Sequence, residues 1–230
     1  MNKGIQRIFS EVPKTYELIN HALTFCLDMV WRKKAARIAA RSGGIRWIDM
    51  CTGTGEMARY LRKRAVGGIQ IFASDFSLPM LSEAVSKSRG DNIQFVISDA
   101  QNLSFDDNTF DLMTISFATR NINWNRQTLI QCFQEFYRVL KPGGRFINLE
   151  TSQPLMTVVR RLFHFYVKVF VKPVGTLLSG SKPGYTYLSN TIPRFYFAEE
   201  LVEILRTAGF RHIRFEKLFP GIAAIHQCRK

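Results

Sequence analysis

The most informative stretch of this 230-residue chain is Asp49-Met50-Cys51-Thr52-Gly53-Thr54-Gly55-Glu56. It follows a β-like run at 45–51 and opens a segment with helical spacing, so it predicts a strand, a glycine loop and a helix in succession. Gly53 and Gly55 let the backbone turn tightly and approach a ligand closely. Asp75 lies 20 residues beyond Gly55, at the end of the next predicted strand, where a carboxylate can accept both hydroxyls of a ribose. The spacing therefore predicts a nucleoside site.

The residues of the loop indicate which nucleoside would bind. A dinucleotide loop has a third glycine, but here Ala58 takes that place, and Glu56 would repel a phosphate. S-adenosylmethionine has a sulfonium and an ammonium group and no phosphate, so the carboxylates of Asp49 and Glu56 suit it better than NAD. The alternative for Asp49 is a hydrogen-bonding role within the turn.

Predicted strands and helices alternate after residue 44. The strands are 45–51, 70–74, 93–97, 111–117, 145–150, 213–218 and 222–227. Ser77 and Asn125 are the N-caps we expect for two of the helices, and 141–144 should end the second of these. This alternation predicts an α/β, Rossmann-like fold with a mostly parallel seven-stranded sheet flanked by helices.

Two segments lie outside that alternation. Residues 1–44 read as helical, with a basic face at Arg32, Lys33, Lys34, Arg37 and Arg41 that we expect to be solvated. Residues 151–198 contain no acidic residue and are rich in bases and aromatics, which predicts a helical lid insertion over the carboxyl edge of the sheet. We therefore expect four parts: an N-terminal helical cap at 1–44, a core that binds S-adenosylmethionine at 45–150, the lid at 151–198 and the rest of the α/β core at 199–230.

Composition narrows the class of protein. The chain has 32 Lys and Arg against 18 Asp and Glu, a net charge of +14, which favours nucleic acid, an anionic membrane surface or an acidic ligand as partner. It has no uncharged apolar stretch of about 18 residues and no secretory signal pattern, so we expect a cytosolic protein. The four cysteines form no C-x-x-C pair, and neither metal-ligand spacing nor a G-x-S-x-G motif occurs. We expect reduced thiols and no metal site.

Two more strand ends carry polar residues. Asp99 and Ala100 follow the third strand, where a carboxylate can accept from an adenine amino group. Ser116 to Asn121 end the fourth strand, beside both ligands of an open α/β sheet.

Together with these residues, several motifs resemble a family of class I methyltransferases. The pieces are Tyr16-Glu17-Leu18-Ile19-Asn20, Trp31-Arg32, 49–56, Thr114-Ile115-Ser116-Phe117-Ala118-Thr119-Arg120-Asn121, Arg138-Val139-Leu140-Lys141-Pro142-Gly143-Gly144, Tyr185-Thr186-Tyr187-Leu188 and the C-terminal 221–226. The chain resembles the demethylmenaquinone methyltransferase and 2-methoxy-6-polyprenyl-benzoquinol methylase family, which C-methylates polyprenyl quinols. It departs from that family at Lys182-Pro183-Gly184 and at 193–197, both in the predicted lid, which leaves the exact acceptor open.

The resemblance implies S-adenosylmethionine as cofactor, a polyprenyl quinol as substrate, and a role in menaquinone or ubiquinone biosynthesis. It implies cofactor contacts at Thr54, Asp75, Asp99, Ala100 and Ser116, to which the loop reasoning adds Asp49, Gly53 and Gly55. It also places Arg120 and Asn121 near the substrate. Because arginine stays protonated, we assign Arg120 to stabilising a quinolate oxygen. Tyr16 is a further candidate contact, and His164 and His226 are weaker candidates for the base.

A substrate that resides in the bilayer gives the basic, aromatic segment 151–198 a use, because bases and aromatics suit anionic headgroups. We therefore expect peripheral association with the inner face of the membrane. The main alternative is a methyltransferase acting on another lipid or small amphiphile. We do not expect nucleic-acid binding, because the bases are spread along the chain without a recognised motif. The sequence is compatible with a homodimer and does not settle the oligomeric state.

Overall fold

The computed structural model describes residues 13–179 and 182–230. Its seven strands form one sheet, and their bounds are β1 Arg46–Met50, β2 Gln70–Asp75, β3 Ile93–Ile97, β4 Phe110–Ser116, β5 Leu140–Thr151, β6 Arg211–Leu218 and β7 Ala223–Arg229. The strand order is β3-β2-β1-β4-β5-β7-β6. Strands β1 to β5 pair in parallel, and β7 pairs antiparallel with both β5 and β6. The predicted mostly parallel, seven-stranded α/β sheet is confirmed.

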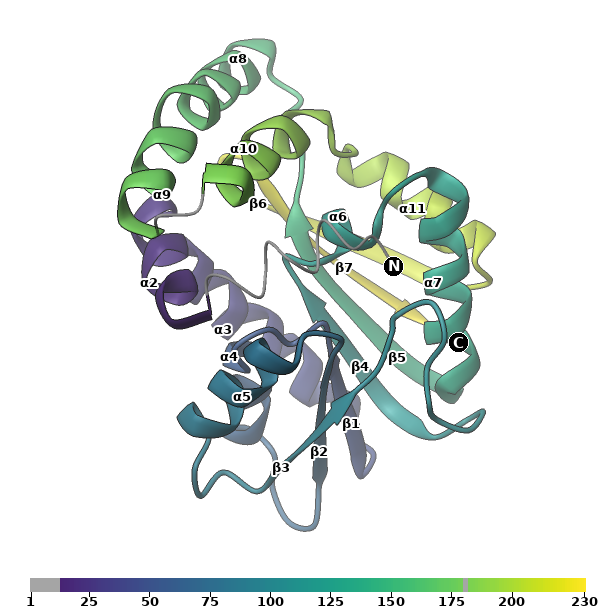
Figure 1. Ribbon diagram of the computed structural model, residues 1–230. Coiled ribbons are helices and arrows are strands. Elements are labelled where there is room, and N and C mark those ends of the chain that lie inside the picture. The colour runs from purple at the N-terminus through teal and green to yellow at the C-terminus, as the bar shows by residue number, and fades with distance from the viewer. Residues whose placement is uncertain (1–12, 180–181) are drawn as a thin grey trace.

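Helices cover both faces of this sheet (Figure 1). Their bounds are α2 Pro13–Leu23, α3 Leu27–Ala39, η1 Ala40–Ser42, α4 Glu56–Arg62, α5 Leu78–Lys87, α6 Thr119–Ile122, α7 Arg126–Val139, α8 Thr157–Tyr166, the π-helical turn η2 Val167–Val171, α9 Lys172–Ser179, α10 Lys182–Thr191, η3 Ile192–Arg194 and α11 Ala198–Thr207. One core cluster packs α7 and α11 on the sheet, and a second packs α3 and α4 on it. None of the described helices is long and apolar enough to cross a bilayer.

Both predicted caps are present, and the second of these helices ends where the sequence predicted. The Ser77 hydroxyl accepts from the backbone N–H of Met80, and the Asn125 side chain accepts from that of Thr128. The helix capped by Asn125 ends at Val139, just before 141–144 as predicted, but the strand predicted at 145–150 already begins at Leu140. The carbonyl of Leu140 cannot continue the helix because its ψ is 141°, so the chain enters the sheet directly.

The N-terminal segment is helical as predicted but interrupted, and one of its bases is not solvated. Phe25 and Cys26 have φ of 52° and 61°, a left-handed conformation that ends α2 before α3 begins. The buried side of α3 includes Arg32, with 6% of its surface exposed. The expectation of a solvated basic face is therefore wrong at Arg32, because acids placed by the fold surround this side chain.

The segment 151–198 is helical as predicted and folds as α8, η2, α9 and α10 with η3, while its role as a lid stays a prediction. It packs on α2, which lies beside α9 in Figure 1. Ile19 and Leu23 of α2 join Val167, Val171 and Tyr185 in a third apolar cluster, separate from the two clusters on the sheet. The cap and the lid thus form one apolar unit beside the carboxyl ends of the strands.

Candidate functional site

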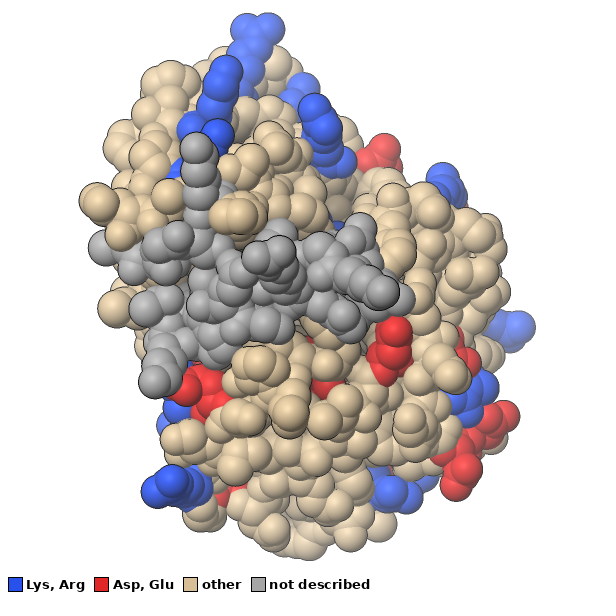
Figure 2. Space-filling model, viewed as in Figure 1, with Lys and Arg blue, Asp and Glu red and all other residues tan. Residues whose placement is uncertain are grey.

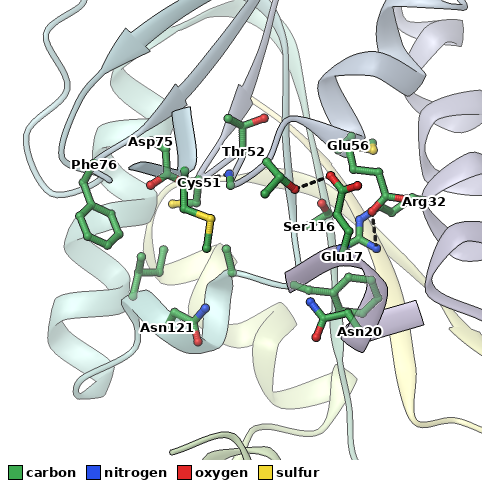
Figure 3. Close-up of a pocket in the computed structure, with 17 residues that line it drawn as sticks. Glu17, Asn20, Arg32, Cys51, Thr52, Glu56, Asp75, Phe76, Ser116 and Asn121 are labelled. Carbon is green, nitrogen blue, oxygen red and sulfur yellow. Dashed lines mark hydrogen bonds and ion pairs between the residues drawn. The ribbon is translucent and has the colours of Figure 1, made fainter. Parts of the chain in front are cut away.

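The strand order reverses direction between β1 and β4, which is where open α/β sheets bind ligands. Two hollows meet there. The first, which we call the glycine-loop cavity, is lined by Glu17, Asn20, Arg32, Cys51, Thr52, Gly53, Thr54, Glu56, Met57, Asp75, Phe76, Met80, Ser116, Phe117, Ala118, Asn121 and Ile122 (Figure 3).

Asp75 forms one wall of this cavity, with Phe76 beside it in Figure 3. Its Oδ2 accepts from the backbone N–H of Gly53 at 2.8 Å, and its Oδ1 accepts from that of Ser77 at 2.9 Å. Burial nevertheless raises the pKa of this carboxyl. Gly53 has φ of 56° and no heavy atom within 4 Å of the place a Cβ would take, so the loop leaves that space to a ligand.

Asp49 lies behind the loop and does not line the cavity. Its two oxygens accept from the hydroxyls of Thr52 and Thr114, each at 2.6 Å. Burial raises its pKa to about 6, although both hydrogen bonds act to lower it. The structure therefore favours the turn-stabilising alternative for Asp49: it ties the loop to β1 and β4.

Helix α2 forms the opposite wall through Glu17. Its Oε1 accepts from the Thr54 hydroxyl at 2.5 Å, and its oxygens pair with Arg59 at 3.2 Å and Lys87 at 2.9 Å. Burial acts to raise the pKa of Glu17, but these partners hold it below its ordinary value. With α2 in this position, the volume of the cavity is about 60 Å³. Sites for cofactor-sized ligands occupy roughly 300–1,000 Å³, so the walls of this cavity have to move apart to admit such a ligand, and α2 is one of these walls.

Arg32 lies at the centre of a buried charge cluster. Its Nη1 is 2.6 Å from Asp28 Oδ2 and 3.2 Å from Glu56 Oε2. His21 is 2.9 Å from Asp28 and 3.8 Å from Glu56. The ligand atoms of His21, Asp28 and Glu56 lie within 4.8 Å of one another, as in a metal site, but here the Arg32 guanidinium pairs with both carboxylates and offsets one of their two charges.

The second hollow, which we call the apolar groove, runs between α2, α3 and the lid helices. Its volume is about 490 Å³. Its lining is Asn20, Leu23, Thr24, Phe25, Leu27, Asp28, Trp31, Arg32, Phe117, Arg120, Thr151, Val159, Leu162, Phe163, Tyr166, Val167, Val171, Leu188, Ile192, Pro220 and Ile222. Most of these side chains are hydrocarbon or aromatic, so the groove suits an extended apolar molecule.

Three residues line both hollows, namely Asn20, Arg32 and Phe117. The Arg32 guanidinium carbon lies 4.9 Å from the centre of the Phe117 ring. Phe117 has φ of 55°, which is rare for a bulky side chain. These three residues form a wall that the two hollows share, which we call the junction, and Phe117 in it has a strained backbone.

Arg120 and Asn121 lie on either side of this junction. Arg120 lines the groove, with Nη1 3.3 Å from Thr151 Oγ1 and 3.9 Å from Glu150 Oε1. Asn121 lines the glycine-loop cavity. The Nε of Arg120 and the Oδ1 of Asn121 are buried and make no hydrogen bond to the described residues. Each hollow is thus lined by a residue that keeps one buried polar atom without a partner among the described residues.

The structure brings together part of the predicted site. Gly53, Thr54, Asp75 and Ser116 line the glycine-loop cavity together with Asn121. Four predicted cofactor residues do not line it: Asp49, Gly55, Asp99 and Ala100. Gly55 has a packing role, since a Cβ there would lie 3.0 Å from Ala84 Cβ.

Asp99 accepts from the backbone N–H of Gln101 at 3.0 Å, and Ala100 is buried in the core. Tyr16 belongs to α2, but its side chain lies outside the described residues. Of the weaker base candidates, His226 is buried against Ala198 O, where burial lowers its pKa to about 4, and His164 contacts Gln153. Neither histidine lines the two hollows.

The sequence reasoning missed Glu17, Asn20, Arg32 and Phe117 as site residues. All four stand within motifs that carried the family resemblance, which was a signal in the sequence that they belong to the site.

Comparisons with known proteins agree with this geometry. A model of the ubiE/COQ5 methyltransferase family matches residues 1–230. The chain is 37% identical over 221 residues to a demethylmenaquinone methyltransferase of Thermus thermophilus, covering 95% of this chain and 98% of that one. It is 33% identical over 223 residues to the ubiquinone/menaquinone biosynthesis C-methyltransferase UbiE of Desulfotalea psychrophila, covering 97% and 89%.

Solved structures of low sequence identity share the fold. A SAM-dependent methyltransferase of Thermotoga maritima has a TM-score of 0.64 at 19% identity, covering 97% of this chain and 99% of that one. A SAM dependent methyltransferase of Aquifex aeolicus has a TM-score of 0.59 at 19% identity, covering 85% and 88%.

Proposed function

The chain belongs to the ubiE/COQ5 methyltransferase family and is a methyltransferase that uses S-adenosylmethionine, and from this premise we propose that it C-methylates the ring of a polyprenyl quinol in menaquinone or ubiquinone biosynthesis. The observation that carries the proposal is the junction at Asn20, Arg32 and Phe117. There a polar cavity on the glycine loop adjoins an apolar groove, which is the arrangement that a polar donor and a prenylated acceptor require.

The residues of the glycine-loop cavity fit S-adenosylmethionine. Three carboxylates line it, from Glu17, Glu56 and Asp75, against the one guanidinium of Arg32. Asp75 stands at the end of β2, where it can accept from the ribose hydroxyls, and Phe76 offers an aromatic face beside it. Thr54 and Ser116 add hydroxyls. We assign to these residues the binding of the donor, which supplies an electrophilic methyl group.

The chain's own part in the chemistry is alignment and charge stabilisation. Holding acceptor and donor in line can offset roughly 7–11 kcal/mol of the barrier. A ring carbon becomes a better nucleophile when a ring hydroxyl is ionised, so a cation near the quinolate oxygen favours transfer. We assign this role to Arg120, which is buried in the groove wall and stays protonated. The same guanidinium can hold the water that takes the ring proton, and Asn121 faces the donor side of the junction.

The decisive experiment uses labelled S-adenosylmethionine with reduced demethylmenaquinone, followed by mass analysis of the product. We expect label on a ring carbon. Parallel reactions with a benzoquinol precursor of ubiquinone and with other lipids test the acceptor. Label that appears only in a lipid other than a quinol would replace this proposal with the alternative acceptor class.

We also infer that the protein works at the inner face of the membrane as a peripheral protein. The support is the lid: Arg161, Lys168 and Lys172 are exposed there, and no acidic residue lies between Glu150 and Glu199. Figure 2 shows Lys and Arg side chains around the upper end of the molecule, the end at which α8 lies in Figure 1. Each base near an anionic surface contributes about 1 kcal/mol. Sedimentation with anionic and neutral vesicles at low salt tests this; equal recovery in the supernatant with both would contradict it.

A further inference from the structure

The apolar groove has two unlike ends. Its inner end is the buried junction at Arg32 and Phe117. Toward the other end its lining residues are exposed, with 77% of the surface of Phe25 and 64% of that of Leu162 accessible. The groove therefore opens at the surface between the α2–α3 turn and helix α8. We call this opening the groove mouth.

Aromatic side chains continue from the mouth onto the surface. The ring of Phe25 lies 6.2 Å from that of Tyr166, which stacks on Phe170 at 5.5 Å. Phe165 and Phe170 are exposed on the lid helices. Water solvates such side chains poorly, whereas the interfacial layer of a bilayer accommodates them.

A third segment reaches the same region from the far end of the chain. The turn between β6 and β7 holds Pro220, which lines the groove, and Phe219, which is 89% exposed. Next in the turn, a Cβ placed on Gly221 would lie 3.5 Å from Pro154 Cα. The turn therefore lies against the chain just before α8, where Leu155 and Met156 are exposed as well. Three separate segments thus line the groove or lie next to it, and each carries exposed apolar side chains.

The positive charge around this apolar surface indicates which kind of partner covers it. The exposed Arg161, Lys168 and Lys172 belong to the same lid helices, and the lid carries no acid. An apolar centre with bases beside it matches an anionic lipid surface, where the apolar groups enter the acyl boundary and the bases meet headgroups.

We propose that the β6–β7 turn inserts Phe219 into the bilayer beside Phe25 and the exposed face of α8, so that the groove opens into lipid and the acceptor enters without crossing water. This rests on the proposed function for the identity of the acceptor, but the contact itself does not depend on it. The contact extends beyond the basic lid, because Phe219 lies 21 residues past its end at 198.

The first test compares Phe219→Ser with Val66→Ser. Val66 is 78% exposed, and it lies between α4 and β2, at the opposite edge of the sheet. Binding is measured by sedimentation with vesicles of phosphatidylcholine and phosphatidylglycerol. Removing one inserted phenyl ring should weaken binding about tenfold, whereas Val66→Ser should bind as the wild type does. Unchanged binding of the Phe219 variant would overturn the proposal.

The second test separates entry from chemistry. A long-tailed quinol within vesicles and a short-tailed quinol in solution are offered to the same variant. We expect a KM several-fold higher for the vesicle-borne quinol, with kcat unchanged, and wild-type kinetics with the soluble one. Equal losses with both quinols would show that Phe219 supports the fold or the groove instead. A wild-type enzyme that methylates neither quinol would refute the proposed function, while the vesicle assay would still decide the contact.

Discussion

Replacing Asp49 by Asn should stabilise the free protein at alkaline pH. The carboxyl is 1% exposed, and burial raises its pKa from 3.8 to about 6. The native state therefore binds this proton more tightly than the unfolded chain does, and the stability that Asp49 contributes falls as the pH rises from about 4 to about 6. A shift of about two units corresponds to about 3 kcal/mol of cost above pH 6. An amide carries no charge, and Thr52 and Thr114 can each donate to it or accept from it.

The assay is thermal unfolding followed by circular dichroism at pH 5 and pH 8. At pH 8 we expect the Tm of Asp49→Asn to exceed that of the wild type by roughly 6–12 °C, with a smaller difference at pH 5. Asp111→Asn is the matched control. The Asp111 carboxylate accepts hydrogen bonds from two backbone N–H groups and pairs with Lys141. Burial acts to raise the pKa of Asp111, but these partners lower it below its ordinary value. Its stabilisation is present at pH 8 and is lost as the pH falls through the lowered pKa, so this variant should lose stability at pH 8.

The reasoning fails if Asp49→Asn unfolds at or below the wild-type temperature at pH 8, or if the gain is the same at both pH values. A second measurement probes function. The Asp49 carboxylate favours a sulfonium over a neutral thioether, so the variant should lose more affinity for S-adenosylmethionine than for S-adenosylhomocysteine in calorimetry.

Three further variants test the site. Asp75→Asn should weaken S-adenosylhomocysteine binding by roughly 10- to 100-fold in calorimetry, because it removes a charged hydrogen-bond acceptor; wild-type affinity would rule Asp75 out as a ribose contact. Arg120→Ala should lower kcat by roughly 10²- to 10³-fold with unchanged S-adenosylhomocysteine affinity. Normal turnover would show that Arg120 does not stabilise the quinolate oxygen. Glu17→Ala should speed association of S-adenosylhomocysteine in stopped-flow measurements, because the contact with Thr54 holds α2 across the cavity; an unchanged rate constant would show that α2 opens by another route.

Several residues of the glycine-loop cavity, which binds the methyl donor in our proposal, could be predicted from the sequence alone. Gly53, Thr54, Asp75 and Ser116 each lie at the end of a predicted strand or just after it, and the carboxyl ends of parallel strands must meet at one edge of a sheet. Strand periodicity and loop composition are local properties, so they place these residues without knowledge of the packing. The same reasoning erred at Asp49, because spacing cannot tell a carboxylate that faces a ligand from one whose oxygens are taken by two threonines.

The apolar groove, which takes the methyl acceptor in our proposal, is formed by packing between segments that are distant in the sequence. Arg32 reads as part of a solvated helix face, yet it is buried because the fold sets Glu56 of another helix against it. Helical periodicity shows which residues share a face, but it does not show what lies opposite. The groove exists only where α2, α3, the lid and the β6–β7 turn converge, so no single stretch of sequence encodes its shape or its opening at Phe25 and Leu162.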